Sequence, residues 1–322
     1  MTNASGPADP ADPSWRHCLP RTSPMRLLVP LLVLLALPAP APAADTSAPG
    51  VAAPAAVLPL EPYRRGVAVR VEANGTQGLM SLDTAAGHTV VSPEFAAAAG
   101  CTPWGGLGGY TMTGTKLDMP RCDGLAFVAG GQPLRAPVAG VMQVAELFAK
   151  DAPPIEGLLA LDVFAGRTIT LDFAGGHLYV ETPASAAQRI AGAREVPVVL
   201  SREAQGHALA VNLEVPTPKG VVRFELDSGN GGTLLVAKPY AALFGLDPDA
   251  QGPQAARIEI APGIVAEGLA FTPAMNIDGN LGMPFLKDWI VTLDLAEGRM
   301  WLRRNPVPAP PKMGVPPTEA AA

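Results

Sequence analysis

A succession of sequence elements occurs twice in this chain, and the repeat constrains the fold more than any other feature. The copies are most alike where they close, because Leu171-Asp172 in the first copy matches Leu293-Asp294 in the second. Ala160 matches Gly282 in the same way, and both matches are separated by 122 positions without a gap. The repeat extends from about Glu61 to Leu302 and predicts two similar lobes in one chain.

Each copy begins with a predicted β-hairpin that ends on an aspartate. In the first copy, alternating residues from Val67 to Glu72 lead to an Asn74-Gly75 turn, and the chain returns to Asp83. In the second copy, the alternation starts at Leu209 and the returning strand reaches Asp227. Alternation with a period of two around such turns is typical of antiparallel strands.

A short helix is expected soon after each aspartate. The segments from Pro93 to Gly100 and from Pro239 to Gly245 are rich in alanine and carry proline at the start and glycine at the end. These residues suit the first helical turn and the C-terminal cap. The predicted fold class is therefore all-β, mainly strands with short helices, in two pseudo-symmetric lobes that span 61–190 and 191–304.

The ends of the chain differ in composition from the repeat. Residues 1–43 read as a secretory signal peptide with an upstream extension, because the basic start at Met25-Arg26 precedes an apolar run and small residues up to Ala43. We expect the start at Met25, cleavage near Ala43, export to the periplasm or the medium, and no stable membrane insertion afterwards. The segments 44–60 and 305–322 are rich in proline and alanine and are predicted to be disordered.

Composition excludes several classes of protein. Hydrophobic residues make up 48% of the chain, too many for an intrinsically disordered protein. The 23 basic and 29 acidic residues give a formal net charge of −6, without a basic cluster for phosphates, so nucleic acid is not an expected partner. The histidines and cysteines are not spaced as metal ligands, so neither a metal nor a cofactor is expected.

Two cysteines, Cys101 and Cys122, remain once the signal peptide is removed. An even number of cysteines in an oxidising compartment is consistent with a disulfide that closes this loop. Two buried free thiols are the alternative.

The ends of the two hairpins carry similar motifs, Leu82-Asp83-Thr84-Ala85-Ala86 and Leu226-Asp227-Ser228-Gly229-Asn230. Here the sequence resembles the aspartic proteases, specifically the bacterial retropepsin-like group. Their signature is hydrophobic-Asp-Thr/Ser-Gly, followed in each lobe by hydrophobic-hydrophobic-Gly. The resemblance covers the chain between its tails and implies a bilobal acid-protease-like β-barrel fold. It also implies a monomer, because both lobes lie in one chain, and a peptide or protein substrate.

The motif suits amide hydrolysis by water, which needs one group to accept a proton and another to donate one. Two nearby carboxyl groups, here Asp83 and Asp227, cannot both ionise cheaply, so the pair holds one proton. We expect the hydroxyls of Thr84 and Ser228 to bond across the lobe interface. The backbone N–H groups at Ala85 and Gly229 would support the carboxylates. The expected activity is that of an aspartic-type endopeptidase.

Lobe one departs from the signature at two positions. Ala85 stands where the motif has glycine, and Leu158-Leu159-Ala160 ends in alanine, whereas lobe two keeps Gly229 and Gly282. An added methyl group either strains the turn or narrows the cleft. The alternative function is therefore a catalytically inactive pseudoprotease that binds a peptide or another ligand. A third reading has the two lobes acting independently and pairing between chains.

Two further residues, Tyr110 and His88, have either a functional role or a purely structural explanation. Tyr110 follows the glycine-rich stretch Gly105 to Gly109, where related folds have a hairpin over the cleft, so it is a candidate flap residue; the alternative is a mobile surface loop. His88 follows the first motif and either tunes the two aspartates or is a solvated turn histidine.

Overall fold

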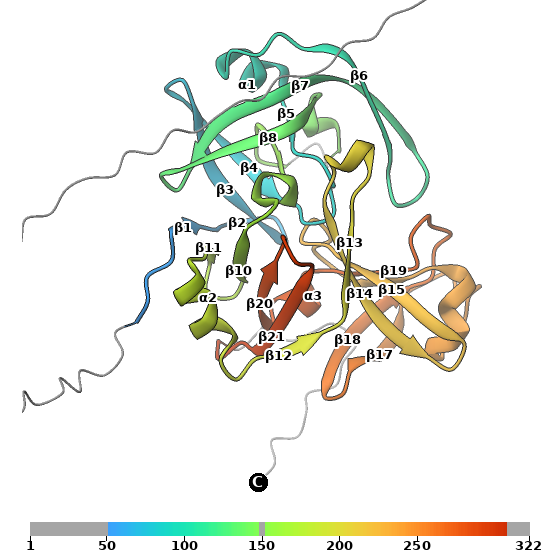
Figure 1. Ribbon diagram of the computed structural model, residues 1–322. Coiled ribbons are helices and arrows are strands. Elements are labelled where there is room, and N and C mark those ends of the chain that lie inside the picture. Colours follow the sequence, from blue (N-terminus) through green and yellow to red (C-terminus); the bar gives the residue numbers. More distant parts are fainter. Residues whose placement is uncertain (1–50, 148–151, 308–322) are drawn as a thin grey trace, which may run out of the picture. The chain divides into compact units, whose positions relative to one another are not determined.

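The repeated hairpins form the centres of two separate sheets. A computed structural model describes residues 51–147 and 152–307 of the chain (Figure 1). It is mostly β-structure with a few short helices, which confirms the predicted fold class. The predicted signal peptide, residues 1–43, lies outside the described residues, as does the tail segment 308–322.

The first lobe contains an eight-stranded sheet with the order β2-β3-β4-β9-β5-β8-β7-β6. Its predicted hairpin is formed by β3 and β4, and the turn residues Asn74 and Gly75 have φ angles of 48° and 81°. Both values are positive, as a tight two-residue hairpin turn requires. The strands of this sheet are β2 (Glu61–Tyr63), β3 (Gly66–Ala73), β4 (Thr76–Leu82), β5 (Val90–Val91), β6 (Trp104–Tyr110), β7 (Lys116–Ala129), β8 (Gln132–Val141) and β9 (Gly157–Leu159).

The second lobe contains a seven-stranded sheet with the order β13-β14-β15-β19-β16-β18-β17. Its predicted hairpin is formed by β14 and β15, which pair from Asn212–Glu225 to Thr217–Gly220. The strands of this sheet are β13 (Val198–Ser201), β14 (Ala210–Thr217), β15 (Gly220–Leu226), β16 (Leu234–Val236), β17 (Gln254–Ala261), β18 (Ile264–Phe271) and β19 (Gly279–Leu281).

Equivalent strands pair in the same way in the two lobes. Strand β4 is parallel to β9, which is antiparallel to β5, and β15 is likewise parallel to β19, which is antiparallel to β16. The backbone N–H of Asp83 donates to the Leu159 carbonyl, and that of Asp227 donates to the Leu281 carbonyl, both at 3.0 Å. Each aspartate therefore leaves the end of an inner strand in the same orientation.

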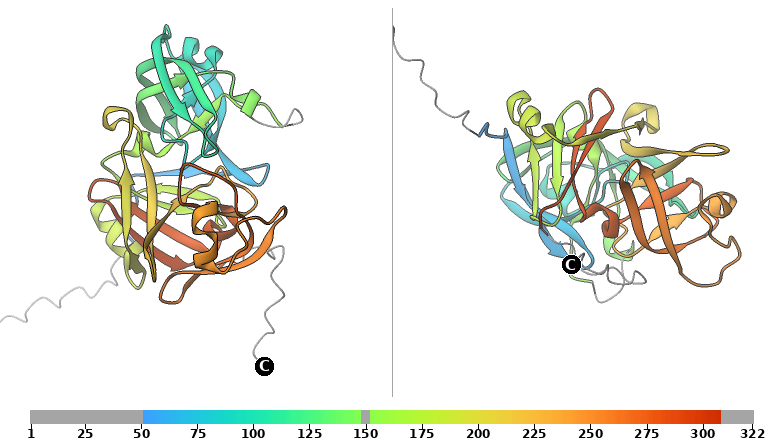
Figure 2. Two further views of the ribbon diagram at one scale, coloured as in Figure 1. Left: turned by 90° about the vertical axis from the view of Figure 1, so that its right-hand side faces the viewer. Right: turned by 90° about the horizontal axis from the view of Figure 1, so that it is seen from below.

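A third sheet is shared by the two lobes and has the order β1-β11-β10-β20-β21-β12. At its centre, β10 and β20 lie antiparallel, with Thr170 opposite Thr292 and their buried hydroxyl oxygens 3.0 Å apart. Equivalent positions of the repeat thus meet on a local twofold axis. Figure 2 shows this sheet from two further directions. Its strands are β1 (Ala56–Pro59), β10 (Thr168–Asp172), β11 (His177–Val180), β12 (Arg194–Val196), β20 (Trp289–Asp294) and β21 (Arg299–Arg304).

The predicted disorder was wrong near both ends of the repeat. Residues 56–59, assigned to a disordered segment, form β1 and pair with β11, because the apolar Leu58 is completely buried there. Asn305, assigned to the C-terminal tail, is buried and its backbone N–H donates to the Asp288 carbonyl. The high proline and alanine content of both segments led to the prediction of disorder.

Helices in the structure are short and lie between strands. Ser92 caps α1 by accepting a hydrogen bond from the Phe95 N–H, and Pro93 occupies the first turn as predicted. No helix among the described residues is long and apolar enough to cross a membrane. The helices are α1 (Pro93–Ala98), α2 (Pro183–Ile190) and α3 (Met283–Leu286), with 3-10 helices η1 (Val144–Leu147), η2 (Leu161–Phe164), η3 (Ala204–Gly206) and η4 (Lys238–Phe244).

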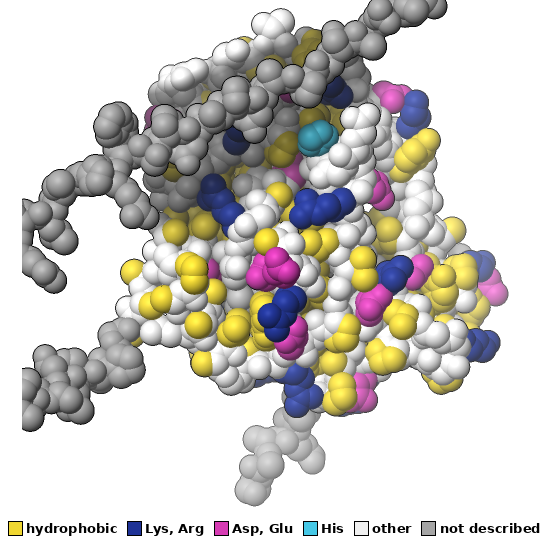
Figure 3. Space-filling model, viewed as in Figure 1, with side chains coloured by type: hydrophobic (Ala, Val, Ile, Leu, Met, Phe, Trp, Pro, Cys, Tyr) yellow, Lys and Arg dark blue, Asp and Glu magenta, His cyan; other side chains and the backbone are white. Residues whose placement is uncertain are grey.

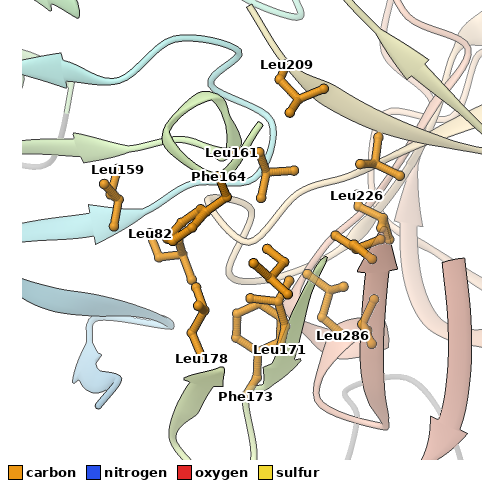
Figure 4. Close-up of a cluster of buried hydrophobic side chains, with 14 of the residues drawn as sticks. Leu82, Leu159, Leu161, Phe164, Leu171, Phe173, Leu178, Leu209, Leu226 and Leu286 are labelled. Atoms are coloured by element: carbon orange, nitrogen blue, oxygen red, sulfur yellow. The ribbon is translucent and has the colours of Figure 1, made fainter. Parts of the chain in front are cut away.

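One large hydrophobic cluster continues from the first lobe into the second. In Figure 4, Leu82 and Leu159 of the first lobe lie on one side of Leu171, from the shared sheet, and Leu226 and Leu286 of the second lobe lie on the other. Burial of such side chains stabilises a fold by about 2 kcal/mol each. The relative position of the lobes is therefore held by apolar packing as well as by the shared sheet.

Two features of the periphery complete the fold. Cys101, just after α1, and Cys122, on β7, form a disulfide with a Cα–Cα distance of 6.1 Å. Basic and acidic side chains are interspersed on the face shown in Figure 3. The protein also has exposed ion pairs, such as Arg299 with Glu195, which contribute little to stability.

Candidate active site

Asp83 and Asp227 come together where the two lobes meet. A Cβ atom built on Gly229 would lie 2.6 Å from Asp83 Oδ2 and 3.1 Å from Asp227 Oδ1. The separation of the two oxygens is therefore no greater than the sum of these two short distances. Asp227 is 3% exposed, while Asp83 is partly exposed. The two carboxyl groups form one site to which each lobe contributes half.

The residues after the aspartates link the lobes through four buried hydrogen bonds. The Thr84 hydroxyl donates to the Leu226 carbonyl at 2.7 Å and accepts from the Ser228 N–H at 3.0 Å. The Ser228 hydroxyl donates to the Leu82 carbonyl at 2.7 Å and accepts from the Thr84 N–H at 3.1 Å. These reciprocal bonds hold the loops that carry Asp83 and Asp227.

Burial makes both carboxyl groups weaker acids than usual, and at Asp83 the charge of Asp227 adds to this effect. Burial, followed by the negative charge of Asp227, raises the pKa of Asp83 to about 7. Burial also raises the pKa of Asp227, although the hydrogen bond from Asn280 opposes this shift. Two carboxyl groups that interact this strongly titrate as a pair, so one proton is shared between them. The site thus offers an acid and a base at the same time.

Although Ala85 replaces the motif glycine, the backbone N–H at this position still donates a hydrogen bond to Asp83. The Ala85 N–H donates to Asp83 Oδ1 at 3.0 Å. Ala85 is also absent from the described non-glycine residues with a positive φ angle, so the methyl group causes no backbone strain of that kind. Gly229 differs, because a methyl group there would overlap the Asp83 carboxyl group. The site therefore requires glycine in lobe two only.

The second departure, Ala160, has a similar explanation. Ala160 has φ and ψ of −95° and 176°, and the equivalent Gly282 has −82° and −169°, so both are extended. A Cβ atom on Gly282 would lie 2.4 Å from the Asn230 carbonyl oxygen. In lobe one the Ala160 N–H instead donates to the Thr89 hydroxyl at 3.2 Å. The two loops pack differently, and alanine is accommodated.

Three polar residues of the site were missed in the sequence. Asn280 donates a hydrogen bond to Asp227. The sequence could have indicated this role, because a polar residue stands here where the motif has a hydrophobic one. Glu225 alternates with the buried Phe224 and Leu226, which suggested a solvent-facing residue, but burial raises its pKa to about 8. Asp162 accepts two hydrogen bonds from Thr89 and so supports the first loop, and burial raises its pKa to about 6.

The candidate flap is the hairpin of β6 and β7, which extends toward the second lobe (Figure 1). Near its tip, the Met112 carbonyl accepts a hydrogen bond of 2.8 Å from the backbone N–H of Asn276 in lobe two. Tyr110 ends β6 and is 68% exposed, so the structure places it on this hairpin but not in a buried contact with the aspartates.

His88 lies in the wall of a pocket of about 440 Å³, which is also lined by His207, Arg121 and Asp123. Among the described residues, neither ring nitrogen of His88 makes a hydrogen bond to Asp83 or Asp227. Burial lowers the pKa of His88, which favours the neutral ring. Within the described part of the chain, no group of His, Cys, Asp and Glu is arranged to hold a metal ion.

Comparison with known proteins supports the fold through structure alone. No family model and no curated protein matches the chain. The crystal structure of basic 7S globulin from soybean superposes with a TM-score of 0.52 at 12% identity, covering 77% of this chain and 94% of that one. The fold is bilobal and pepsin-like. At this identity the match says nothing about activity.

Two other solved structures were found with lower scores. Conglutin gamma, a basic 7S globulin from lupine seeds, has a TM-score of 0.48 at 12% identity and covers 78% of this chain and 95% of that one. An aspartic proteinase from Irpex lacteus has a TM-score of 0.47 at 11% identity and covers 78% of this chain and 97% of that one.

Replacing Thr84 with valine tests the link between the lobes. We expect Thr84→Val to lower the free energy of unfolding by about 3 kcal/mol, because the Ser228 N–H and the Leu226 carbonyl lose their buried partner. Urea unfolding measures the change. The control is Thr76→Val, on exposed surface, with an expected change below about 0.5 kcal/mol. Equal losses in both variants would contradict this role for Thr84.

Proposed function

We propose that the protein is an aspartic-type endopeptidase that hydrolyses peptide bonds with a water molecule activated between Asp83 and Asp227. The observation that carries the proposal is the convergence of the two carboxyl groups beside Gly229. The raised pKa of both groups supports it, since a shared proton gives an acid and a base together. The retained N–H donation from Ala85 supports an intact first half-site.

The reaction can be written with the two carboxyl groups alone. In the first step, the ionised carboxylate accepts a proton from water while the water oxygen attacks the peptide carbon. The protonated carboxyl group gives its proton to the carbonyl oxygen, which yields a tetrahedral diol. In the second step, the first carboxyl group protonates the amide nitrogen, the C–N bond breaks and a diol proton returns to the second carboxyl group. Both groups end in their starting states.

The setting of this activity follows from the sequence. The motifs in each lobe favour a retropepsin-like enzyme of the bacterial group, exported to the periplasm or the medium by the segment that ends near Ala43. Pairing of the aspartates within one chain supports a monomer, because no second copy is needed to complete the site. The substrate is proposed to be a peptide or protein.

The second candidate function is a pseudoprotease that binds peptides or another ligand without cutting them. The presence of Ala85 and Ala160 in place of the two signature glycines of lobe one favours it. The geometry around Ala85 argues against it, because neither the hydrogen bond nor the backbone conformation is lost.

Removal of either carboxyl group should abolish cleavage. For Asp83→Asn and Asp227→Asn we expect kcat/KM to fall about ten-thousandfold or more, with cooperative unfolding retained, because an amide can neither take nor give the proton. A peptide-library assay with purified protein measures the loss. The control is Asp249→Asn, which alters an aspartate with a 74% exposed side chain. Unchanged turnover in Asp227→Asn would rule out the mechanism.

Exchanging the residues at the two motif positions separates the two candidate functions. Gly229→Ala should lower kcat/KM more than about a hundredfold, because its methyl group would displace the Asp83 carboxyl group. Ala85→Gly should change kcat/KM less than about fivefold, since the N–H donor is the same. An inactive natural protein that begins to cut peptides after Ala85→Gly would instead identify a pseudoprotease.

A further inference from the structure

Both aspartates of the site accept a hydrogen bond from a backbone N–H group, but only Asp227 has a side-chain donor in addition. Asp227 Oδ2 accepts a hydrogen bond of 2.6 Å from the Asn280 side chain, and its Oδ1 accepts one of 3.0 Å from the Asn230 N–H. Asp83 Oδ1 accepts from the backbone N–H of Ala85. Among the described residues, no side chain donates a hydrogen bond to Asp83. The ionised form is therefore favoured more at Asp227 than at Asp83.

The orientation of the Asn280 amide is set by its neighbours. The side-chain oxygen of Asn230 accepts from the backbone N–H groups of Gly232 and Thr233, so its nitrogen must face the other way. That nitrogen donates to the Thr233 carbonyl at 2.9 Å and to Asn280 Oδ1 at 2.8 Å. Asn280 consequently presents its NH₂ group to Asp227. Because Asn280 is completely buried, water does not compete for this bond.

The first lobe has no counterpart of this arrangement. The residue equivalent to Asn280 is Leu158, and the residue equivalent to Asn230 is Ala86, so neither side chain can donate a hydrogen bond. The asymmetry is therefore encoded in the repeat itself, at the first position of the hydrophobic-hydrophobic-Gly motif.

The carboxyl groups near Asp227 act in the opposite direction, and the basic side chain of Arg65 packs against Gly231 and Gly232 in the loop that follows Asp227. The charge of Asp227 acts on two carboxyl groups, those of Asp83 and of Glu225, and Glu225 lies two positions earlier on β15 and opposite Asn280 on β19. Burial raises the pKa of Glu225 to about 8, with the charges of Asp227 and Asp83 as further causes, so Glu225 is neutral at pH 7 and below. The charge of Glu203 also raises the pKa of Glu225. Against these carboxyl groups, Asn280 supplies a side-chain donor.

We propose that Asn280 is a positioning residue that keeps Asp227 as the ionised member of the pair, so that the shared proton resides on Asp83. This proposal rests on the proposed function for its role in catalysis, where Asp227 becomes the base that takes a proton from water. Asp83 becomes the acid that protonates the peptide carbonyl. The hydrogen bond itself exists in the resting protein and can be tested without a substrate.

The test is a pH titration of ¹³C-labelled aspartate carboxyl groups by NMR, with Asp83 and Asp227 assigned through their asparagine variants. In the natural protein we expect Asp227 to have the lower midpoint. In Asn280→Leu, which copies Leu158 of lobe one, that midpoint should rise by about one to two pH units, because a hydrogen bond to a charged group is lost. In the pH profile of kcat/KM, the midpoint of the acidic limb should move to higher pH by a similar amount.

Asn305→Leu is the matched control, because Asn305 is also buried and its side chain donates to an aspartate, Asp172, at 2.7 Å. It should leave both midpoints of the pair unchanged. Asn280→Ala provides the same readout if the leucine variant does not fold. An unchanged Asp227 midpoint in the Asn280 variants, or a lower midpoint at Asp83 in the natural protein, would overturn the proposal. Absence of cleavage together with the expected titration would refute only the proposed function.

Discussion

The reciprocal hydrogen bonds between Thr84 and Ser228 are the interaction on which the site depends. Each hydroxyl satisfies a carbonyl and an N–H of the opposite lobe, in a buried environment where an unpaired group is costly. Together with the Thr170–Thr292 pair in the shared sheet, they fix the local twofold axis. The aspartates immediately precede these residues, so a fixed axis also fixes the two carboxyl groups.

Symmetry brings the aspartates together, and departures from symmetry make them different. Lobe two has an asparagine pair, Asn230 and Asn280, where lobe one has only apolar side chains. The same packing explains the glycine requirement, because Asn230 fills the space beside Gly282 while Ala160 lies against a differently arranged loop. Lobe one therefore lacks both the signature glycines and the asparagine pair, but Asp83 keeps its hydrogen bond from the Ala85 N–H.

The sequence predicted the features that short-range patterns encode. The two hairpins, the capped helix at Pro93 and the position of each aspartate follow from alternation and turn residues within about twenty positions. Strand β1 was missed because its partner, β11, is over a hundred residues away and its own composition suggests disorder. Glu225 was missed because alternation with buried residues is equally typical of a solvent-facing side chain. Glu225 is close to Asp227 in the sequence, but only the assembled fold buries it and brings it near Asp83 as well.

The central claim is that Asp83 and Asp227 form one site with a single shared proton. Neutron diffraction from crystals of the deuterated protein, grown between about pH 5 and 6, tests this most directly, because it locates both the carboxyl oxygens and the deuterium atoms. The account predicts carboxyl groups in direct contact or joined by one water molecule, with one deuterium between them. A wider separation, or a deuterium on each carboxyl group or on neither, would contradict it.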